Sequence, residues 1–229
     1  LLDRIKGTAH GYFRFVNVAF AQEVCRRYAS KHPEAPRVNL HGDAHVEQYA
    51  ITDLGRGLTD FDDSTAGPAA LDLIRFGVSL RLAAEALGFA EEQDKLLTAF
   101  YAGYERGLED PNAIPQPPAV VSELQAGFSK DREKYFGWVE SVMKPVADEA
   151  KADLHKAWPS YERLVRGQDD KLAPNFFDMV RLGSLTMGIG SALDEKYLVR
   201  VQGPTEAPLD DVVLEVKEVR DLSGIDCVT

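Results

Sequence analysis

Apolar residues recur at three- and four-residue intervals over most of the first three quarters of the chain, a spacing typical of amphipathic helices. In the first such stretch, Phe13, Phe20 and Val24 share one face, so this helix is expected to pack on a core. The predicted helices span residues 10–31, 69–87, 90–108, 120–143, 146–158 and 161–165. The body of the protein is therefore predicted to be mainly helical.

Short runs of β-branched and apolar residues predict strands beside a polar loop. Residues 37–40 form one such run and lead directly into the polar segment 41–45. Residues 49–52 and 58–61 flank a glycine-bearing turn, which is typical of a β-hairpin. Polar residues therefore follow the predicted strands closely, a common arrangement at functional sites.

The last part of the chain has a residue pattern that differs from the helical periodicity before it. Three more runs rich in β-branched residues, separated by turn residues, occur at 180–186, 196–202 and 212–219. The pattern predicts an α+β protein with a helical lobe at residues 1–175 and a small, incomplete antiparallel β lobe at residues 176–229.

Charge and cysteine content limit the partners and the cellular compartment that the protein can have. The chain has 26 Lys and Arg against 37 Asp and Glu, a net charge of −11, which opposes nucleic-acid binding. Its two cysteines, Cys25 and Cys227, are too few for a disulfide framework or a zinc cluster, and a reducing environment fits them. The sequence contains neither a signal-peptide pattern nor an apolar stretch of membrane-spanning length. We expect a cytoplasmic protein without nucleic-acid or membrane partners; the oligomeric state stays open.

The densest group of chemically active residues is His-Gly-Asp-Ala-His at 41–45, followed by Asp-Phe-Asp-Asp at 60–63. If the strand and the hairpin fold together, Asp43 and Asp60 lie close, and two carboxylates that close need a cation or a proton between them. Carboxylate and amide oxygens suit Mg²⁺, so the pattern predicts a divalent-metal site. For Asp62 and Asp63, a solvated turn is an equally good interpretation.

A second group lies in the predicted β lobe. Glycines at 188 and 190, followed by Ser191, would let a turn approach a phosphate closely, and Lys217 on a nearby strand would supply positive charge. Taken alone, a Gly-x-Gly sequence is more typical of an ordinary turn than of a phosphate-binding loop. A single lysine on a strand is likewise more typical of a charge at the edge of a sheet.

Together the two groups resemble the catalytic loop and metal-binding segment of aminoglycoside and choline phosphotransferases of the protein-kinase-like superfamily. A longer series of motifs resembles the bacterial domain of unknown function 2252 family, and it comprises 6–10, 42–45, 59–63, 67–68, 72–75, 188–191 and 216–218. This resemblance implies a kinase-like fold with permuted lobes, because the glycine turn and the lysine follow the catalytic loop instead of preceding it.

The resemblance also implies roles for individual residues. Asp43 would accept the proton of an attacking hydroxyl, and Asp60 would bind Mg²⁺ at the ATP phosphates. Asp62 would be a second carboxylate on the same strand face, and Gln48 stands where kinases have a metal-binding asparagine. Gly188, Gly190 and Ser191 would cover the triphosphate, which Lys217 would also contact.

Three further residues are expected to support this site. His41 and His45 are interpreted as structural, holding the loop through their ring nitrogens, in preference to a catalytic role. Asp72 resembles the buried aspartate that accepts backbone N–H groups of the catalytic loop; an ordinary charge at a helix N-terminus is the alternative.

The implied activity is ATP- and Mg²⁺-dependent transfer of a phosphoryl group to a hydroxyl acceptor, a small molecule. One alternative is a nucleotide-binding pseudoenzyme, suggested by Gln48 and by the lack of a glutamate-bearing helix after Lys217. The other is a metal-dependent hydrolase. Its ligands would be His41, Asp43, His45, Asp60 and Asp62.

Overall fold

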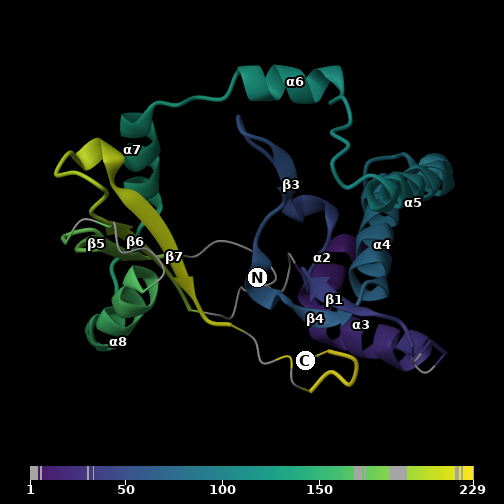
Figure 1. Ribbon diagram of the computed structural model, residues 1–229, viewed down its shortest axis with the longest axis horizontal. Coiled ribbons are helices and arrows are strands. Elements are labelled where there is room, and N and C mark those ends of the chain that lie inside the picture. Colours follow the sequence, from purple (N-terminus) through teal and green to yellow (C-terminus); the bar gives the residue numbers. More distant parts are fainter. Residues whose placement is uncertain are drawn as a thin grey trace. The chain divides into compact units, whose positions relative to one another are not determined.

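The computed structural model contains two compact units (Figure 1). The residues that the structure describes are 5, 7–29, 31–32, 34–167, 172, 174–185, 195–219, 222 and 224–228. Those of the first unit lie within 1–128 and 219–229, and those of the second within 129–188 and 192–218. The sequence predicts a boundary near residue 175, whereas the compact units divide after residue 128 because the last two helices join the β sheet.

Two short helices take the place of the single helix predicted over 10–31. Thr8 caps α2 (Ala9–Phe15) by accepting a hydrogen bond of 2.9 Å from the Gly11 N–H. Val16 then leaves helical geometry, and α3 (Asn17–Val24) follows, extended by the π-helical turn η1 (Cys25–Ala29). The prediction of a continuous helix over 10–31 is therefore wrong at Val16, a β-branched residue that fits a helix interior less well.

Two antiparallel strand pairs form the next part. The pair β1 (Arg37–Leu40) and β4 (Thr65–Pro68) sets Leu40 opposite Thr65. Between them the chain forms η2 (Val46–Gln48), the hairpin β2 (Tyr49–Ile51) and β3 (Arg56–Leu58), and η3 (Phe61–Asp63). The hairpin is confirmed, but its second strand ends at Leu58 instead of residue 61, since Asp60 adopts a left-handed conformation with φ of 67°.

Helices α4 (Ala70–Ala86) and α5 (Gln93–Glu109), joined through η4 (Ala90–Glu92), lie side by side (Figure 1). Their predicted ranges are confirmed to within three residues. The two helices approach closely at Gly77, where an added Cβ would lie 2.9 Å from the Tyr101 hydroxyl and would require that side chain to shift. Helix α6 (Ala119–Ala126) follows and contacts the hairpin turn through Gln125, whose Nε2 donates to the Thr52 carbonyl at 2.9 Å.

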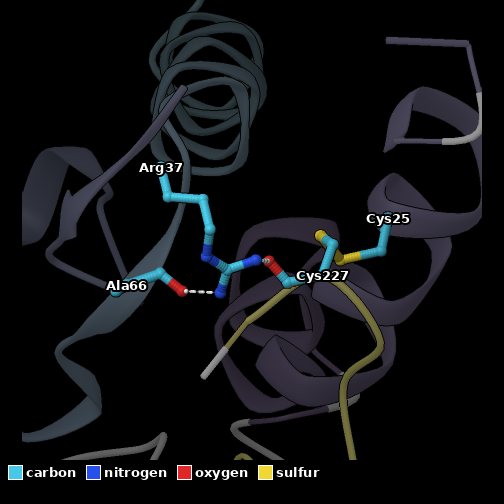
Figure 2. The surroundings of a disulfide bond; sticks show 4 residues. All are labelled: Cys25, Arg37, Ala66 and Cys227. Atoms are coloured by element: carbon cyan, nitrogen blue, oxygen red, sulfur yellow. Dashed lines mark hydrogen bonds between the residues drawn. A yellow bond between two sulfur atoms is a disulfide. The ribbon is translucent and has the colours of Figure 1, made fainter. Parts of the chain in front are cut away.

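The C-terminal segment returns to the first unit and is bonded to it covalently. Cys25 and Cys227 form a disulfide across 202 positions of sequence. Figure 2 shows the Arg37 guanidinium between two carbonyls, that of Ala66 at 2.8 Å and that of Cys227 at 3.3 Å. This single bond was not predicted from the sequence, where the cysteines were considered only as too few for a disulfide framework, because the chain return that brings them together leaves no signal in their spacing. The core at this place contains Val24, Cys25, Leu40, Leu71, Ile225, Cys227 and Val228.

The second unit packs two helices with a three-stranded antiparallel sheet. Its sheet order is β5 (Met179–Ser184), β6 (Lys196–Val201) and β7 (Val212–Lys217). The helices are α7 (Arg132–Val142) and α8 (Asp148–Arg166), and η5 (Pro208–Asp210) precedes the last strand. The predicted helix 120–143 is thus two helices, α6 and α7, and the predicted 146–158 and 161–165 are one, which continues through Pro159.

The core of the second unit centres on the sheet. Val199 and Val201 of β6 are fully buried and belong to one cluster with the buried Phe177. Trp158 of α8 donates its indole N–H to the Phe177 carbonyl at 3.0 Å. The protein is therefore of the α+β class, as the sequence predicted. Within the described part of the chain, none of the helices combines the length and apolarity that a bilayer crossing needs.

Candidate functional site

The polar loop after β1 and the acidic segment after β3 lie against each other. Nε2 of His41 is 2.7 Å from the Thr59 carbonyl, and the Thr59 N–H donates to the Gln48 carbonyl at 2.8 Å. Gly42, with φ of 83°, lies so near Asp63 that a Cβ would be 1.7 Å from the Asp63 carbonyl oxygen. The two halves of the first sequence group, the loop at 41–45 and the acidic segment at 60–63, are therefore neighbours.

Asp72 fixes the backbone of the loop from the first turn of α4. Its carboxylate accepts the N–H groups of His41 at 2.6 Å and of Gly42 at 3.0 Å. These are the backbone contacts that the resemblance implied for Asp72. Burial raises the pKa of this carboxyl group above its ordinary value, and the two backbone hydrogen bonds partly oppose that effect.

Asp43 is buried and is held by Arg75, a residue of α4. The Nε of Arg75 donates to Oδ1 of Asp43 at 2.6 Å, and Nη2 contacts the same oxygen. The guanidinium also lies over the ring of Phe13, 4.4 Å from its centroid. These contacts fix the orientation of the Asp43 carboxylate.

His45 sits on the other side of the Asp43 carboxylate. Its Nδ1 accepts the Glu47 N–H at 3.2 Å, so the proton of the neutral ring is on Nε2, which lies 3.7 Å from Oδ2 of Asp43. Burial lowers the pKa of His45 to about 3, with a smaller contribution from Arg14. A distance of 3.7 Å is too long for a hydrogen bond. His45 is therefore a neutral residue that caps η2, in agreement with the structural interpretation.

His41 likewise uses both ring nitrogens on the backbone. Nδ1 accepts the Asp43 N–H at 3.2 Å, while Nε2 is bonded to the Thr59 carbonyl. The imidazole thus joins the loop to the segment that leads into Asp60. With both nitrogens engaged in this way, His41 fits a supporting role and not that of a metal ligand.

Two of the predicted metal-binding residues contact each other. Nε2 of Gln48 donates to Oδ2 of Asp60 at 3.0 Å. Asp60 is one of the described non-glycine residues with a positive φ, a strained conformation that occurs preferentially at functional sites. The hard oxygen donors of this pair suit Mg²⁺, provided that the Gln48 amide turns its oxygen toward the ion.

Asp62 and Asp63 differ from expectation. The sequence predicts Asp62 on the strand face of Asp60, but both residues beyond Asp60 lie in η3, so the alternation of a strand does not apply to them. Asp63 is buried and accepts a hydrogen bond of 2.8 Å from Nδ2 of Asn17, which shows that it is a structural residue and not part of a solvated turn.

Among the described residues, no group of three or more His, Cys, Asp and Glu side chains is arranged to hold a metal ion. A magnesium ion that also binds nucleotide phosphates needs only one or two protein carboxylates, so the Gln48–Asp60 pair is compatible with that kind of site. The five-ligand centre of the hydrolase alternative does not form within the described part of the chain.

Of the second sequence group, the structure describes Lys217, which belongs to the β sheet of the second unit. Lys217 ends β7, and its Nζ lies 3.6 Å from Oε2 of Glu215, on the same strand face as predicted. Gly188, Gly190 and Ser191 fall outside the described residues. Lys217 is thus described in its own unit, and its predicted role at the phosphates stays a prediction.

Two residues at the site carry no role in the sequence prediction. Arg75 is a single charge within the apolar stripe of α4, and that anomaly was the available signal for a buried ion pair. Asn17 donates to the Gly42 carbonyl at 3.0 Å as well as to Asp63, so it joins α3 to both the loop and the acidic segment. An asparagine on the apolar side of a predicted helix gives a similar signal.

The fold and site define an α+β protein with a buried aspartate on a loop whose backbone is held by a helix. The chain belongs to the DUF2252 family, described as uncharacterised proteins conserved in bacteria, and the match covers residues 2–172. That range includes Asp43, Gln48, Asp60, Asp72 and Arg75. Neither a curated protein nor a solved structure matches the chain.

Proposed function

We propose that this protein is an ATP- and Mg²⁺-dependent phosphotransferase with a kinase-like fold whose lobes are permuted. The observation that carries the proposal is the loop from His41 to Gln48: Asp72 holds its start, Asp43 is oriented within it, and its end contacts Asp60. A proton-accepting carboxylate and a pair of hard oxygen ligands on adjacent segments are what phosphoryl transfer to a hydroxyl requires.

In this proposal the protein acts by positioning and by charge. Asp43 accepts the proton of the acceptor hydroxyl, and Arg75 orients its carboxylate. Asp60 and Gln48 hold Mg²⁺, which supplies neutralisation of the phosphate charge. The role at the remaining phosphates that the resemblance implies stays with Gly188, Gly190, Ser191 and Lys217. The acceptor is a small molecule, for which the net charge of −11 favours a cationic one.

A second candidate is a nucleotide-binding protein of the same fold without turnover. The observation that favours it is the hydrogen bond from the Gln48 amide nitrogen to Asp60, because a metal ligand would present the amide oxygen instead. ATP affinity and ATP consumption measured on one sample separate the two. Binding with no consumption over a broad panel of hydroxyl acceptors would select the second candidate.

The test of the nucleotide site is a thermal-shift titration with ATP, with and without Mg²⁺. Wild type should show a metal-dependent rise in melting temperature, and Asp60→Asn should lose it. Asp94→Asn is the matched control, because it removes the same charge from a carboxylate whose side chain is 89% exposed. If ATP with Mg²⁺ gives wild type no shift, both candidates fail; an unchanged shift in Asp60→Asn removes Asp60 from the site.

A cytoplasmic location is also part of the proposal, although a disulfide such as Cys25–Cys227 is uncommon in that compartment. Trapping of free thiols in intact cells, before lysis, tests it. Two trapped thiols per chain support the cytoplasm, and a fully oxidised pair supports an oxidising compartment.

A further inference from the structure

The first unit contains a cavity that the proposed phosphotransferase chemistry does not use. It has a volume of about 330 Å³ and is bounded by β1, the β2–β3 hairpin, α4 and α5. Pockets that bind small molecules have volumes of roughly 300–1,000 Å³, so this cavity lies at the small end of that range. It is large enough for one ring with a short substituent.

Aromatic side chains make up much of the lining. Tyr49, Phe76, Phe100 and Tyr104 all border the cavity, and Phe76 and Phe100 stack with their centroids 4.8 Å apart. Tyr49 and Tyr104 are 45% and 37% exposed, which gives the cavity an opening to solvent. The faces of aromatic rings carry partial negative charge and attract cations, most strongly where water is excluded.

The formal charge of the lining has one sign. Of the described residues that border the cavity, Asp72 is the single one with a carboxylate, and none is Lys, Arg or His. The Asp72 carboxylate accepts the backbone N–H groups of His41 and Gly42 and is the one formal charge among the described lining residues. A ligand cation is attracted by that charge, whereas an anion is repelled by it. The net charge of −11 attracts cations to the protein in the same sense.

We propose that this cavity binds a small organic cation, an ammonium group that carries an aromatic or short apolar part. The apolar part packs among the rings, and the ammonium group lies within the field of the ring faces and of Asp72. The inference is independent of the proposed phosphotransferase activity, because it requires neither Mg²⁺ nor nucleotide.

The test is calorimetric titration of the full chain with three probes that share a ring but differ in charge: phenethylammonium, 2-phenylethanol and phenylacetate. We expect phenethylammonium to bind about tenfold more tightly than the alcohol, and phenylacetate to show no binding. The same titration in the presence of ATP and Mg²⁺ should give the same affinity, which separates this site from the nucleotide site.

Variants of α5 locate the binding. Tyr104→Lys places an ammonium group at the cavity and should abolish phenethylammonium binding; Leu108→Lys makes the same charge change on an exposed residue of the same helix and should leave it nearly unchanged. Tyr104→Ala should weaken binding roughly fivefold through loss of one ring, and Tyr104→Phe should retain it. The partial exposure of Tyr104 makes these variants compatible with folding.

Four results would overturn the proposal. They are no binding of the cation up to its solubility, equal binding of the neutral alcohol, binding of phenylacetate, and equal binding by Tyr104→Lys and Leu108→Lys. The last result would place the cation elsewhere on the acidic surface. If Tyr104→Lys fails to fold, the comparison of Tyr104→Ala with Tyr104→Phe decides the same question.

Discussion

Arg75 and Asp72, one helical turn apart on α4, hold different parts of the same loop. Asp72 accepts the backbone N–H groups of His41 and Gly42, while Arg75 donates to the side chain of Asp43. One helix therefore sets both the path of the loop and the direction of its carboxylate. Such support of a reactive group by a rigid element is the arrangement that positions functional residues most accurately.

Arg75→Gln should destabilise the first unit strongly. Loss of the guanidinium leaves the buried Asp43 carboxylate without its partner, which costs about 3–5 kcal/mol of unfolding free energy. The double variant Arg75→Gln/Asp43→Asn should recover part of that loss, because no unpaired charge is left. Urea unfolding of the single and double variants measures the coupling, and purely additive effects would contradict the ion pair.

Gly42→Ala should be among the most damaging small substitutions. Its Cβ would lie 1.7 Å from the Asp63 carbonyl oxygen, and the positive φ adds strain, so we expect a loss of about 3 kcal/mol or more. Gly57→Ala is the control, because no atom lies within 4 Å of the added Cβ. Similar urea midpoints for the two variants would show that the loop at Gly42 and the acidic segment at Asp63 do not approach each other closely.

Stability should fall in acid through His45. Its folded pKa of about 3 lies below the ordinary value of 6.5, so between these values the unfolded chain binds more protons than the folded one. Stability is therefore greatest above pH 6.5 and decreases as pH falls toward 3, by no more than about 1.4 kcal/mol per pH unit for one group.

His45→Gln should flatten the pH dependence of the unfolding free energy over that window, as measured by urea titration at several pH values. The exposed His155 supplies the control His155→Gln. Equal slopes for wild type and His45→Gln would mean that this imidazole does not titrate as its burial implies.

Reduction of the disulfide should lower the melting temperature of wild type. In the chain-entropy description, a cross-link across 202 residues lowers the entropy of the unfolded chain and so raises the free energy of unfolding by about 5 kcal/mol. The gain is smaller where the unfolded state retains structure. Dithiothreitol should leave the double variant Cys25→Ser/Cys227→Ser unaffected. An equal response of the two proteins would attribute the effect to the reagent and not to the bond.

Local patterns predicted α4, α5 and the β2–β3 hairpin, because amphipathic periodicity and turn residues act over short stretches of chain. The pairing of β1 with β4 was not predicted, since antiparallel partners separated by a hairpin leave no mark in either strand. The break at Val16 and the continuity of α8 through Pro159 escape prediction for a related reason: the surrounding packing decides between nearly equal local conformations.

At the site, the adjacency of the loop at 41–48 and the segment at 59–63 was predicted correctly, because strand ends and a hairpin bring them together. The residues that hold this loop in place were harder to predict. Arg75 was visible as a charge in an apolar stripe, but its partner could not be chosen from sequence. The shared role of Asp43, Asp60 and Lys217 at one nucleotide stays a prediction, which the magnesium-dependent thermal shift and Lys217→Ala test.

The bond between Cys25 and Cys227 closes the polypeptide between these two residues into a covalent ring. The entire second unit lies within this ring, so a protease that cuts once anywhere in it opens the circle without releasing a piece. Nicked protein should therefore migrate as one species on a non-reducing gel and separate into two fragments only after reduction. A nick beyond the ring, at either end, would free a peptide under both conditions.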